Sequence, residues 1–304
     1  MHGPQAVRVT AIVNRGAGSL AGQELTAESL GESFRAAGIE AEVHFVDGSR
    51  VQAAAREALA RSVDALIAGG GDGTVRTVAA VLAGRREALG VLPLGTLNHF
   101  AKDLGMPLAV EEAVAALASG RVQALDLGEV NGEVFVNNSS IGLYPTVVVV
   151  RDRQRKLLGR GKWLATASAL LKVVPRLPPL DVRLKVEGRA IGRHTHFAFI
   201  GNNEYEMSLF DYGARSRLDS GDLYLYIARC SSRWCIVGVT LLALFRDVTA
   251  TRHFESWCLP EFSIETRKKA LPVYLDGEVV MLEPPLRYRT LPRALRVLMP
   301  PPAE

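Results

Sequence analysis

Near residue 70, four glycines surround a carboxylate in a loop that follows the apolar run Val63–Ala68: Gly69, Gly70, Gly71, Asp72, Gly73 and Thr74. Glycine lets the backbone approach a ligand with no Cβ in the way. A helix expected at Thr74–Leu82 would present free N–H groups and a positive dipole end, which suit a phosphate. Because Asp72 would repel a phosphate alone, it favours a site that also holds Mg²⁺ or accepts a hydroxyl proton.

A second polar loop, Pro93–Asn98, offers a hydroxyl and an amide beside a glycine. Thr96 and Asn98 can hold a phosphate in such a turn, and Gly95 gives the backbone room. The simpler alternative is a pair of strand-to-helix turns without a ligand. In that case Asp72 is the N-cap of the following helix, and Thr96 and Asn98 serve turn and capping chemistry. The occurrence of both loops together favours ligand binding.

The elements around these loops alternate between strand and helix. Strands are expected at Val7–Val13, Ala41–Val46, Val63–Ala68 and Gly90–Leu92, and helices at Gln23–Ala37, Val51–Arg61, Thr74–Leu82 and Val110–Ser119. This alternation predicts right-handed βαβ units and a mainly parallel sheet, with ligands beyond the carboxyl ends of the strands. A third loop follows the first strand and belongs to the same edge: Asn14, Arg15, Gly16, Ala17 and Gly18.

From Leu127 onwards the pattern becomes rich in strands. Asn131-Gly132 between apolar runs predicts a hairpin with a type I′ turn, and alternation recurs around residues 182–186 and 223–227. Helical segments at Arg151–Val174 and Trp234–Arg246 interrupt these strands. We therefore expect an α/β fold: a mainly parallel N-terminal α/β domain with phosphate loops at 1–126, and a β-rich, sandwich-like C-terminal domain at 127–289.

The two phosphate-type loops carry a resemblance to a known family. The GGDGT pattern alone is shared with NAD kinases and loosely with phosphofructokinases, but GGDGT followed by PLGTLN resembles the diacylglycerol kinase catalytic-domain family. That family includes soluble bacterial lipid kinases and sphingosine and ceramide kinases. The resemblance runs from Asn14 to the segment Leu275–Glu278. It implies that the tail, about residues 290–304, returns to the first domain as a strand.

The resemblance implies a nucleotide site for ATP with Mg²⁺. The residue matching Asp72 helps organise ATP, magnesium and the accepting hydroxyl, and the residue matching Thr96 contacts nucleotide. Asn14–Gly18 matches the family's NPxSG loop loosely, since Arg15 replaces proline and Ala17 replaces serine. A plain strand-to-helix turn therefore stays open for that loop.

An acidic pair near the end of the chain, Asp276 and Glu278, matches the family's source of the general base. A base must lie within hydrogen-bond reach of the lipid hydroxyl. The resemblance implies Glu278 as this base, supported by Asp276. From the residues alone, the alternative is a hairpin turn at Asp276-Gly277 with a solvated Glu278.

Three positions concern charge or a metal. Asp126 matches an acidic residue of a charged network near the active site, with a locally paired strand-end Asp as the alternative. His99 stands where the family usually has Asp, and imidazole is no simple replacement for a carboxylate. The bacterial members bind a structural Mg²⁺ where this chain has Ser220 in place of the ligand Asp. Either Asp219 or Asp222 substitutes, or the ion is absent.

The composition and net charge of the chain limit the kinds of molecule and surface that it is expected to bind. A chain of 304 residues with net charge +4 and pI near 9.0 fits acidic small molecules or an anionic lipid surface, and it shows no nucleic-acid fingerprint. Three cysteines without metal spacing favour a reducing cytoplasm. We expect no signal peptide and no membrane span. The basic run Arg151–Lys162 indicates peripheral contact with the inner face of the membrane, with a solvated helix face as the alternative.

Together with these observations, the resemblance implies an ATP-dependent lipid kinase that transfers γ-phosphate to a lipid hydroxyl at a membrane surface. Diacylglycerol is the expected substrate on family frequency. A sphingoid-base or ceramide kinase, an NAD kinase-like enzyme, and a degenerate non-catalytic lipid- or nucleotide-binding protein remain alternatives. A homodimer is also left open.

Overall fold

The computed structural model describes residues 8–18, 25–143, 145, 148, 179–186, 188–205, 215, 217–228 and 254–301. The helical segments expected at Arg151–Val174 and Trp234–Arg246, and the basic run, lie outside these described residues. Contacts between Cα atoms divide the chain into two compact units. The first comprises Met1–Leu127 with Pro292–Glu304, and the second comprises Gly128–Leu291.

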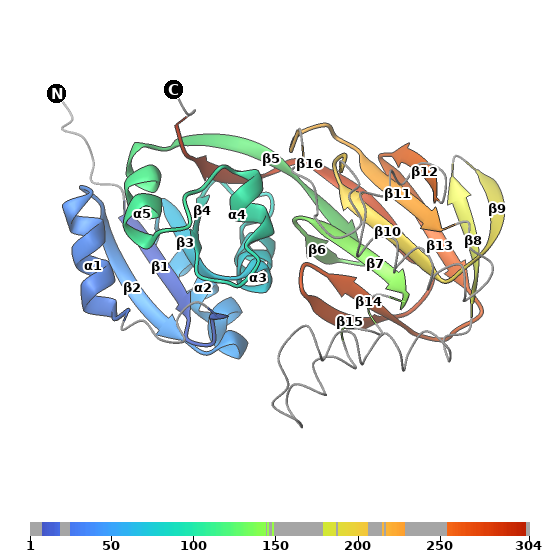
Figure 1. Cartoon of the computed structure of the whole chain (residues 1–304), viewed down its shortest axis with the longest axis horizontal. Helices are drawn as coiled ribbons and strands as arrows, with labels where there is room; N and C mark the ends of the chain where they lie inside the picture. Colours follow the sequence, from blue (N-terminus) through green and yellow to red (C-terminus); the bar gives the residue numbers. More distant parts are fainter. Residues whose placement is uncertain are drawn as a thin grey trace, which may run out of the picture. The chain divides into compact units, whose positions relative to one another are not determined.

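A parallel sheet forms the centre of the first unit (Figure 1). Its order is β2-β1-β3-β4-β16, and each neighbouring pair is parallel. Every residue of β3 and β4 is buried, as expected for strands covered on both faces. The strands are β1 (Arg8–Asn14), β2 (Glu40–Val46), β3 (Ala65–Gly70), β4 (Ala88–Pro93) and the end of β16 (Leu286–Met299).

Helices cover this sheet in two groups. The helices are α1 (Ala27–Ala36), η2 (Gly48–Arg50), α2 (Val51–Ala60), α3 (Asp72–Leu82), α4 (His99–Asp103) and α5 (Val110–Ser119). Helix α1 contacts α5, whereas α2 contacts α3. The chain moves outward from β1 to β2 and then crosses back to β3, so right-handed crossovers place α1 and α2 on opposite faces. The direction of winding therefore reverses between β1 and β3, where such folds bind ligands.

Two antiparallel sheets form the second unit. One has the order β16-β13-β8-β9, and the other has the order β12-β11-β10-β7-β14-β15. The hairpin β5-β6 pairs with β16 through β5. The strands are β5 (Arg121–Val130), β6 (Glu133–Phe135), β7 (Asn138–Gly142), β8 (Leu180–Val186), β9 (Arg189–Thr195), β10 (Phe197–Asn202), β11 (Leu223–Ala228), β12 (Phe254–Leu259), β13 (Glu261–Thr266), β14 (Leu271–Leu275) and β15 (Glu278–Leu282).

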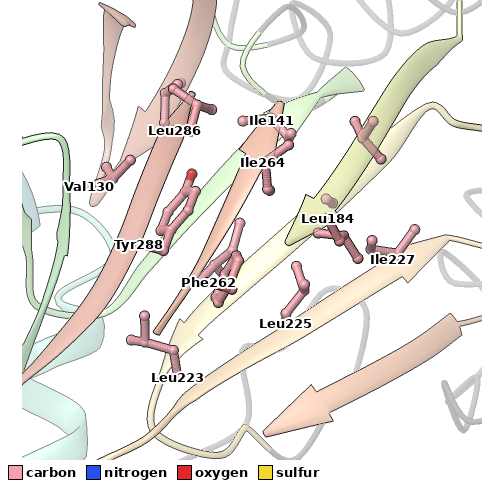
Figure 2. Packing of buried hydrophobic residues seen from close by; sticks show 14 of the residues in the cluster. Val130, Ile141, Leu184, Leu223, Leu225, Ile227, Phe262, Ile264, Leu286 and Tyr288 are labelled. Carbon is pink, nitrogen blue, oxygen red and sulfur yellow. The ribbon is translucent and has the colours of Figure 1, made fainter. Parts of the chain in front are cut away.

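An apolar core joins these two sheets (Figure 2). Residues alternate along each strand, so β8 buries Leu180, Val182 and Leu184 and exposes the residues between them. Tyr288 of β16 is fully buried in this core, with its ring stacked on Phe262 at 5.0 Å. Its hydroxyl shares a 3.0 Å hydrogen bond with Ser139, and burial raises the pKa of Tyr288 well above its ordinary value. The core makes this unit a β-sandwich.

The predicted fold class is therefore confirmed: a parallel α/β unit and a β-rich unit. The predicted hairpin at Asn131-Gly132 is also confirmed, with φ angles of 49° and 88° that suit a type I′ turn. Among the described helices, none has the length and apolar character that crossing a membrane requires.

Candidate active site

Three loops meet at the carboxyl edge of the parallel sheet, beside the β1/β3 reversal. A Cβ added at Gly18 would lie 2.5 Å from Oγ1 of Thr96, and one added at Gly95 would lie 2.3 Å from Cα of Gly71. At Gly95 the obstacle is backbone, so glycine is required there for the close approach of the loops, whereas a side chain at Gly18 would have to displace the Thr96 hydroxyl. The structure brings the three predicted loops together.

Asn14 links the loop at residues 14–18 to the glycine-rich loop at residues 69–74. Its Nδ2 donates to Oγ1 of Thr74 at 3.1 Å, and its Oδ1 accepts from the backbone N–H of Gly16 at 2.9 Å. Arg15 instead uses Nε to donate to the carbonyl of Phe45 at the end of β2, at 3.2 Å. The Asn14 amide therefore holds the end of the glycine-rich loop at Thr74, in the first turn of α3.

Asp72 links the glycine-rich loop at residues 69–74 to helix α4, which follows the loop at residues 93–98. Helix α3 begins at Asp72 itself, and its N-cap is Gly71. The alternative interpretation of Asp72 as the N-cap of this helix is therefore wrong. Its Oδ1 instead accepts the backbone N–H of Phe100, in α4, at 3.1 Å. The carboxylate lies in the first turn of α3, where the helix dipole favours negative charge.

Asn98 serves mainly its own loop. Its backbone is left-handed, with φ 52°, and the residue is 8% exposed. Oδ1 accepts from the N–H of Gly95 at 2.9 Å, while Nδ2 donates to the carbonyls of Pro93 and Gly95 at 3.2 and 2.9 Å. The amide thus closes the turn that presents Thr96, and Thr96 is exposed.

Asp126 is buried within β5 and 3% exposed. Its carboxylate accepts the backbone N–H of Arg293 at 2.8 Å, where β16 has a left-handed residue with φ 52°. This contact joins residues that are 167 positions apart in the sequence. A charged network that includes Asp126 and the half-buried His99 stays a prediction.

The acidic pair of the second unit lies in a tight turn between β14 and β15. Asp276 and Gly277 have φ angles of 45° and 104°, the left-handed pair of a two-residue hairpin. Asp276 is 2% exposed, and its carboxylate accepts the backbone N–H groups of Val136, Asn137 and Asn138. Glu278, at the start of β15, is exposed.

This geometry gives the two acids different roles. Both oxygens of Asp276 hold the bend at residues 136–138, which fixes the turn. Glu278 has the accessible carboxylate, as a base that meets a substrate hydroxyl requires. The hairpin interpretation and the catalytic interpretation of this segment are therefore compatible.

Ser220 anchors a loop. Its hydroxyl donates to Oδ1 of Asn203 at 2.6 Å, and its backbone N–H donates to the same oxygen at 2.8 Å. Asp219 lies 3.5 Å from Nε of Arg217, and the carbonyl of Asp222 accepts the N–H of Asn203 at 3.2 Å. Within the described part of the chain, no group of three His, Cys, Asp or Glu residues could hold a metal ion. Both alternatives for the family's structural Mg²⁺, replacement of the ligand by Asp219 or Asp222 and absence of the ion, stay predictions.

The bend at residues 136–138 and its partner Arg215 were missed in the sequence. Arg215 lies on a segment without periodicity, and the bend is formed by contacts far apart in the chain. The available clue is the polar run Asn137-Asn138-Ser139-Ser140, which interrupts apolar residues and is entirely buried. Buried polar groups require partners, so such a run indicates a network.

Comparisons with known proteins show which family the chain resembles. Residues 8–130 match the family described as the diacylglycerol kinase catalytic domain. A "probable lipid kinase YegS-like" protein of Pseudomonas aeruginosa is 35% identical over 251 residues, covering 80% of this chain and 79% of the relative. The diacylglycerol kinase of Bacillus subtilis is 27% identical, covering 88% and 89%. A crystal structure of a diacylglycerol kinase from Bacillus anthracis shares the fold, with TM-score 0.67, 18% identity and 97% of both chains covered.

Proposed function

The chain belongs to the diacylglycerol kinase catalytic domain family, and we propose that it transfers the γ-phosphate of ATP to the hydroxyl of a lipid. The observation that carries this proposal is the meeting of three loops at the β1/β3 edge, where Gly95 has no room for a side chain against the backbone of Gly71, and Gly18 lies against the Thr96 hydroxyl. Such a cradle suits phosphate groups, which approach backbone N–H donors closely.

Different residues of the first unit contribute different contacts to ATP. The N–H groups of the glycine-rich loop and of the first turn of α3 face the phosphates, and the Thr96 hydroxyl adds a donor. Asn14 and Asn98 hold the loops that present these donors. When bound with the nucleotide, Mg²⁺ neutralises charge on the phosphates, and Asp72 is the carboxylate of these loops that suits it.

Glu278 accepts the proton of the lipid hydroxyl as the new phosphate ester forms. Its exposure supports this assignment, because a base must meet its substrate. Asp276 holds the turn on which Glu278 lies and acts as a positioning residue.

Diacylglycerol is the substrate that we propose, supported by the relative from Bacillus subtilis that carries this name. A lipid substrate places the reaction at a membrane surface, and the net charge of +4 favours an anionic one. Sphingoid bases and ceramide offer comparable primary hydroxyls and form the second substrate class.

The test is the transfer of labelled γ-phosphate to a panel of acceptors: diacylglycerol, ceramide and sphingosine in anionic vesicles, and free NAD. We expect labelled phosphatidate, and loss of this product in the Glu278→Gln variant. Labelling of NAD instead of a lipid would overturn the proposed function. Absence of transfer to every acceptor, in a protein that still binds ATP, would favour a non-catalytic binding protein.

A further inference from the structure

Arg215 is a buried cation in the second unit, with 5% exposure. One guanidinium nitrogen donates to the carbonyls of Val136 and Asn202, at 2.9 and 3.0 Å. The other terminal nitrogen donates to Oδ1 of Asn137 at 2.9 Å. The guanidinium carbon also lies 5.5 Å from the centre of the Tyr205 ring, within range of a cation–π contact.

The target of Arg215 is the bend between β6 and β7. The N–H groups of residues 136–138 point to the carboxylate of Asp276, whereas the Val136 carbonyl and the Asn137 side chain point to Arg215. A buried carboxylate therefore holds the donor side of the bend, and a buried guanidinium holds its acceptor side. Connected hydrogen bonds of this kind polarise one another, which strengthens the network around the bend.

Asn202 closes the network from β10. Its Nδ2 donates to the Val136 carbonyl at 2.9 Å, and its backbone N–H donates to the carbonyl of Asn137 at 2.9 Å. The Asp276 N–H donates to the carbonyl of Asn138 at 3.2 Å, so the turn and the bend bind each other in both directions. Displacing the bend must therefore displace the turn that carries Glu278.

From this arrangement we propose that Arg215 is a positioning residue for Glu278, acting through the bend at residues 136–138 and through Asp276. The inference rests on the proposed function, in which Glu278 is the base. Glu278 follows Asp276 by two residues, and the buried carboxylate of Asp276 links the turn between them to the bend at residues 136–138. A shift of about 1 Å in a catalytic group can cost ~10²-fold in rate.

The planar fork of arginine is central to the proposal. Two terminal nitrogens reach three acceptors in fixed directions, which a lysine ammonium cannot reproduce. Arg215→Lys keeps the positive charge beside the bend but loses the fork. Turnover should therefore fall in this variant even though the charge is retained.

The experiment measures kcat and KM for ATP and for diacylglycerol in anionic vesicles with Arg215→Lys, Arg215→Met and Asn137→Ala. The matched control is Arg217→Met, since Arg217 lies two residues further on and its side chain is 69% exposed. We expect kcat to fall about 10- to 100-fold in the Arg215 variants. KM for ATP should stay constant, and the control should match the unmodified protein.

Combination with Glu278→Gln separates positioning from general structural damage. If Arg215 acts through Glu278, adding Arg215→Lys to Glu278→Gln should lower the residual rate no further. Asn137→Ala removes one acceptor and keeps the arginine, so it tests the same link if the Arg215 variants do not fold. Hydrogen exchange in the full-length Asn137→Ala protein should show faster exchange at the amides of residues 136–138.

The outcomes distinguish this inference from the proposed function. Full turnover in Arg215→Lys and in Asn137→Ala, with Glu278→Gln impaired, would overturn the role of Arg215 and leave the kinase intact. Equal rate losses with and without Glu278→Gln would overturn it too, because the damage would not pass through Glu278. Full turnover in Glu278→Gln would overturn both assignments.

Discussion

The two units build their chemical groups in opposite ways. In the first unit, backbone approaches backbone: Gly18, Gly71 and Gly95 allow three loops to touch, and short side chains link them. In the second unit, two buried charged side chains, Asp276 and Arg215, bind opposite sides of the bend at residues 136–138. The turn that carries Glu278 is held to this bend by Asp276. The glycine-rich loops of the first unit can be recognised from the local sequence, whereas the network of the second unit joins residues up to 140 positions apart.

The comparison predicts that the largest loss of rate follows removal of the exposed acid. Glu278→Gln should lower kcat by ~10²–10⁴-fold, the usual contribution of a general base. The thermal midpoint should stay within about 1 °C, since Glu278 is exposed and glutamine has nearly the same size and shape. Steady-state kinetics with a melting curve measures both. Near-normal turnover in a folded variant would remove Glu278 from the mechanism.

In the first unit, Asp72→Asn should rank next, with a loss of about 10²–10³-fold in kcat, because a charge is removed beside the phosphates and Mg²⁺. The Asn side chain still offers an oxygen to the Phe100 N–H, so the loops should stay joined. Nucleotide binding by calorimetry and turnover by labelled transfer separate the two effects. If specific activity is retained and only the folded fraction falls, the carboxylate serves the fold alone.

A side chain added at Gly95 tests whether the first unit depends on close contact between backbone segments. Gly95→Ala would place Cβ at 2.3 Å from Cα of Gly71 and 2.6 Å from Oδ1 of Asn98, so the loops at residues 69–74 and 93–98 must separate. We expect ATP affinity to fall at least about tenfold, comparable with a strain of ~1–3 kcal/mol. Gly84→Ala is not a suitable control because its φ of 72° strains any side chain; Gly192→Ala, which meets open space, is suitable.

These predictions also show what the sequence could reveal. The parallel sheet, the three loops and the Asn-Gly hairpin follow from local patterns, because glycine turns and apolar runs report directly on backbone shape. Helix α5 was predicted at its observed bounds, Val110–Ser119. The true start of α3 was missed by two residues, since Asp at a helix start fits both the N-cap and the first turn.

The buried network could not be predicted in the same way. Nothing in the local sequence pairs Arg215 with Asn137, or Asp276 with residues 136–138, because these contacts depend on the pairing of β7 with β10 and β14. The same reasoning applies to Asp126, whose partner is the backbone of Arg293. Side-chain types show that a buried polar group needs a partner, but only the tertiary fold identifies which one.

Asp276→Asn should reduce stability in the second unit more than any change among the loop amides of the first. Asp276 accepts three backbone N–H groups in a site with 2% exposure, and the neutral amide replaces one acceptor oxygen with a donor. We expect a loss of about 1–3 kcal/mol in the free energy of unfolding. Denaturant titration of Asp276→Asn and Asn98→Ala compares the units directly, and an equal loss in both would contradict the contrast.

The smallest expected effect concerns Ser220, the position at which bacterial members of the family bind a structural Mg²⁺. In the unmodified chain, Ser220 donates to Asn203, so we expect no response of the thermal midpoint to Mg²⁺ without nucleotide. Ser220→Asp places a carboxylate next to Oδ1 of Asn203, where two facing oxygens repel each other unless a cation lies between them. The variant should melt below the unmodified protein in EDTA and recover in Mg²⁺. At ten times the dissociation constant, binding contributes about 1.4 kcal/mol, roughly 2–4 °C.

Calcium is the control ion for this measurement, because a site made for Mg²⁺ requires short, nearly octahedral oxygen contacts and should respond less to the larger ion. Ser220→Ala is the control variant, since it removes the hydroxyl without adding charge. If the unmodified protein already gains stability from Mg²⁺ without nucleotide, and Asp219→Asn or Asp222→Asn abolishes the gain, one of these acids has replaced the missing ligand. The loop at Ser220 would then hold a cation as well as its hydrogen bonds to Asn203. The second unit would depend on this cation in addition to the buried charges of Arg215 and Asp276.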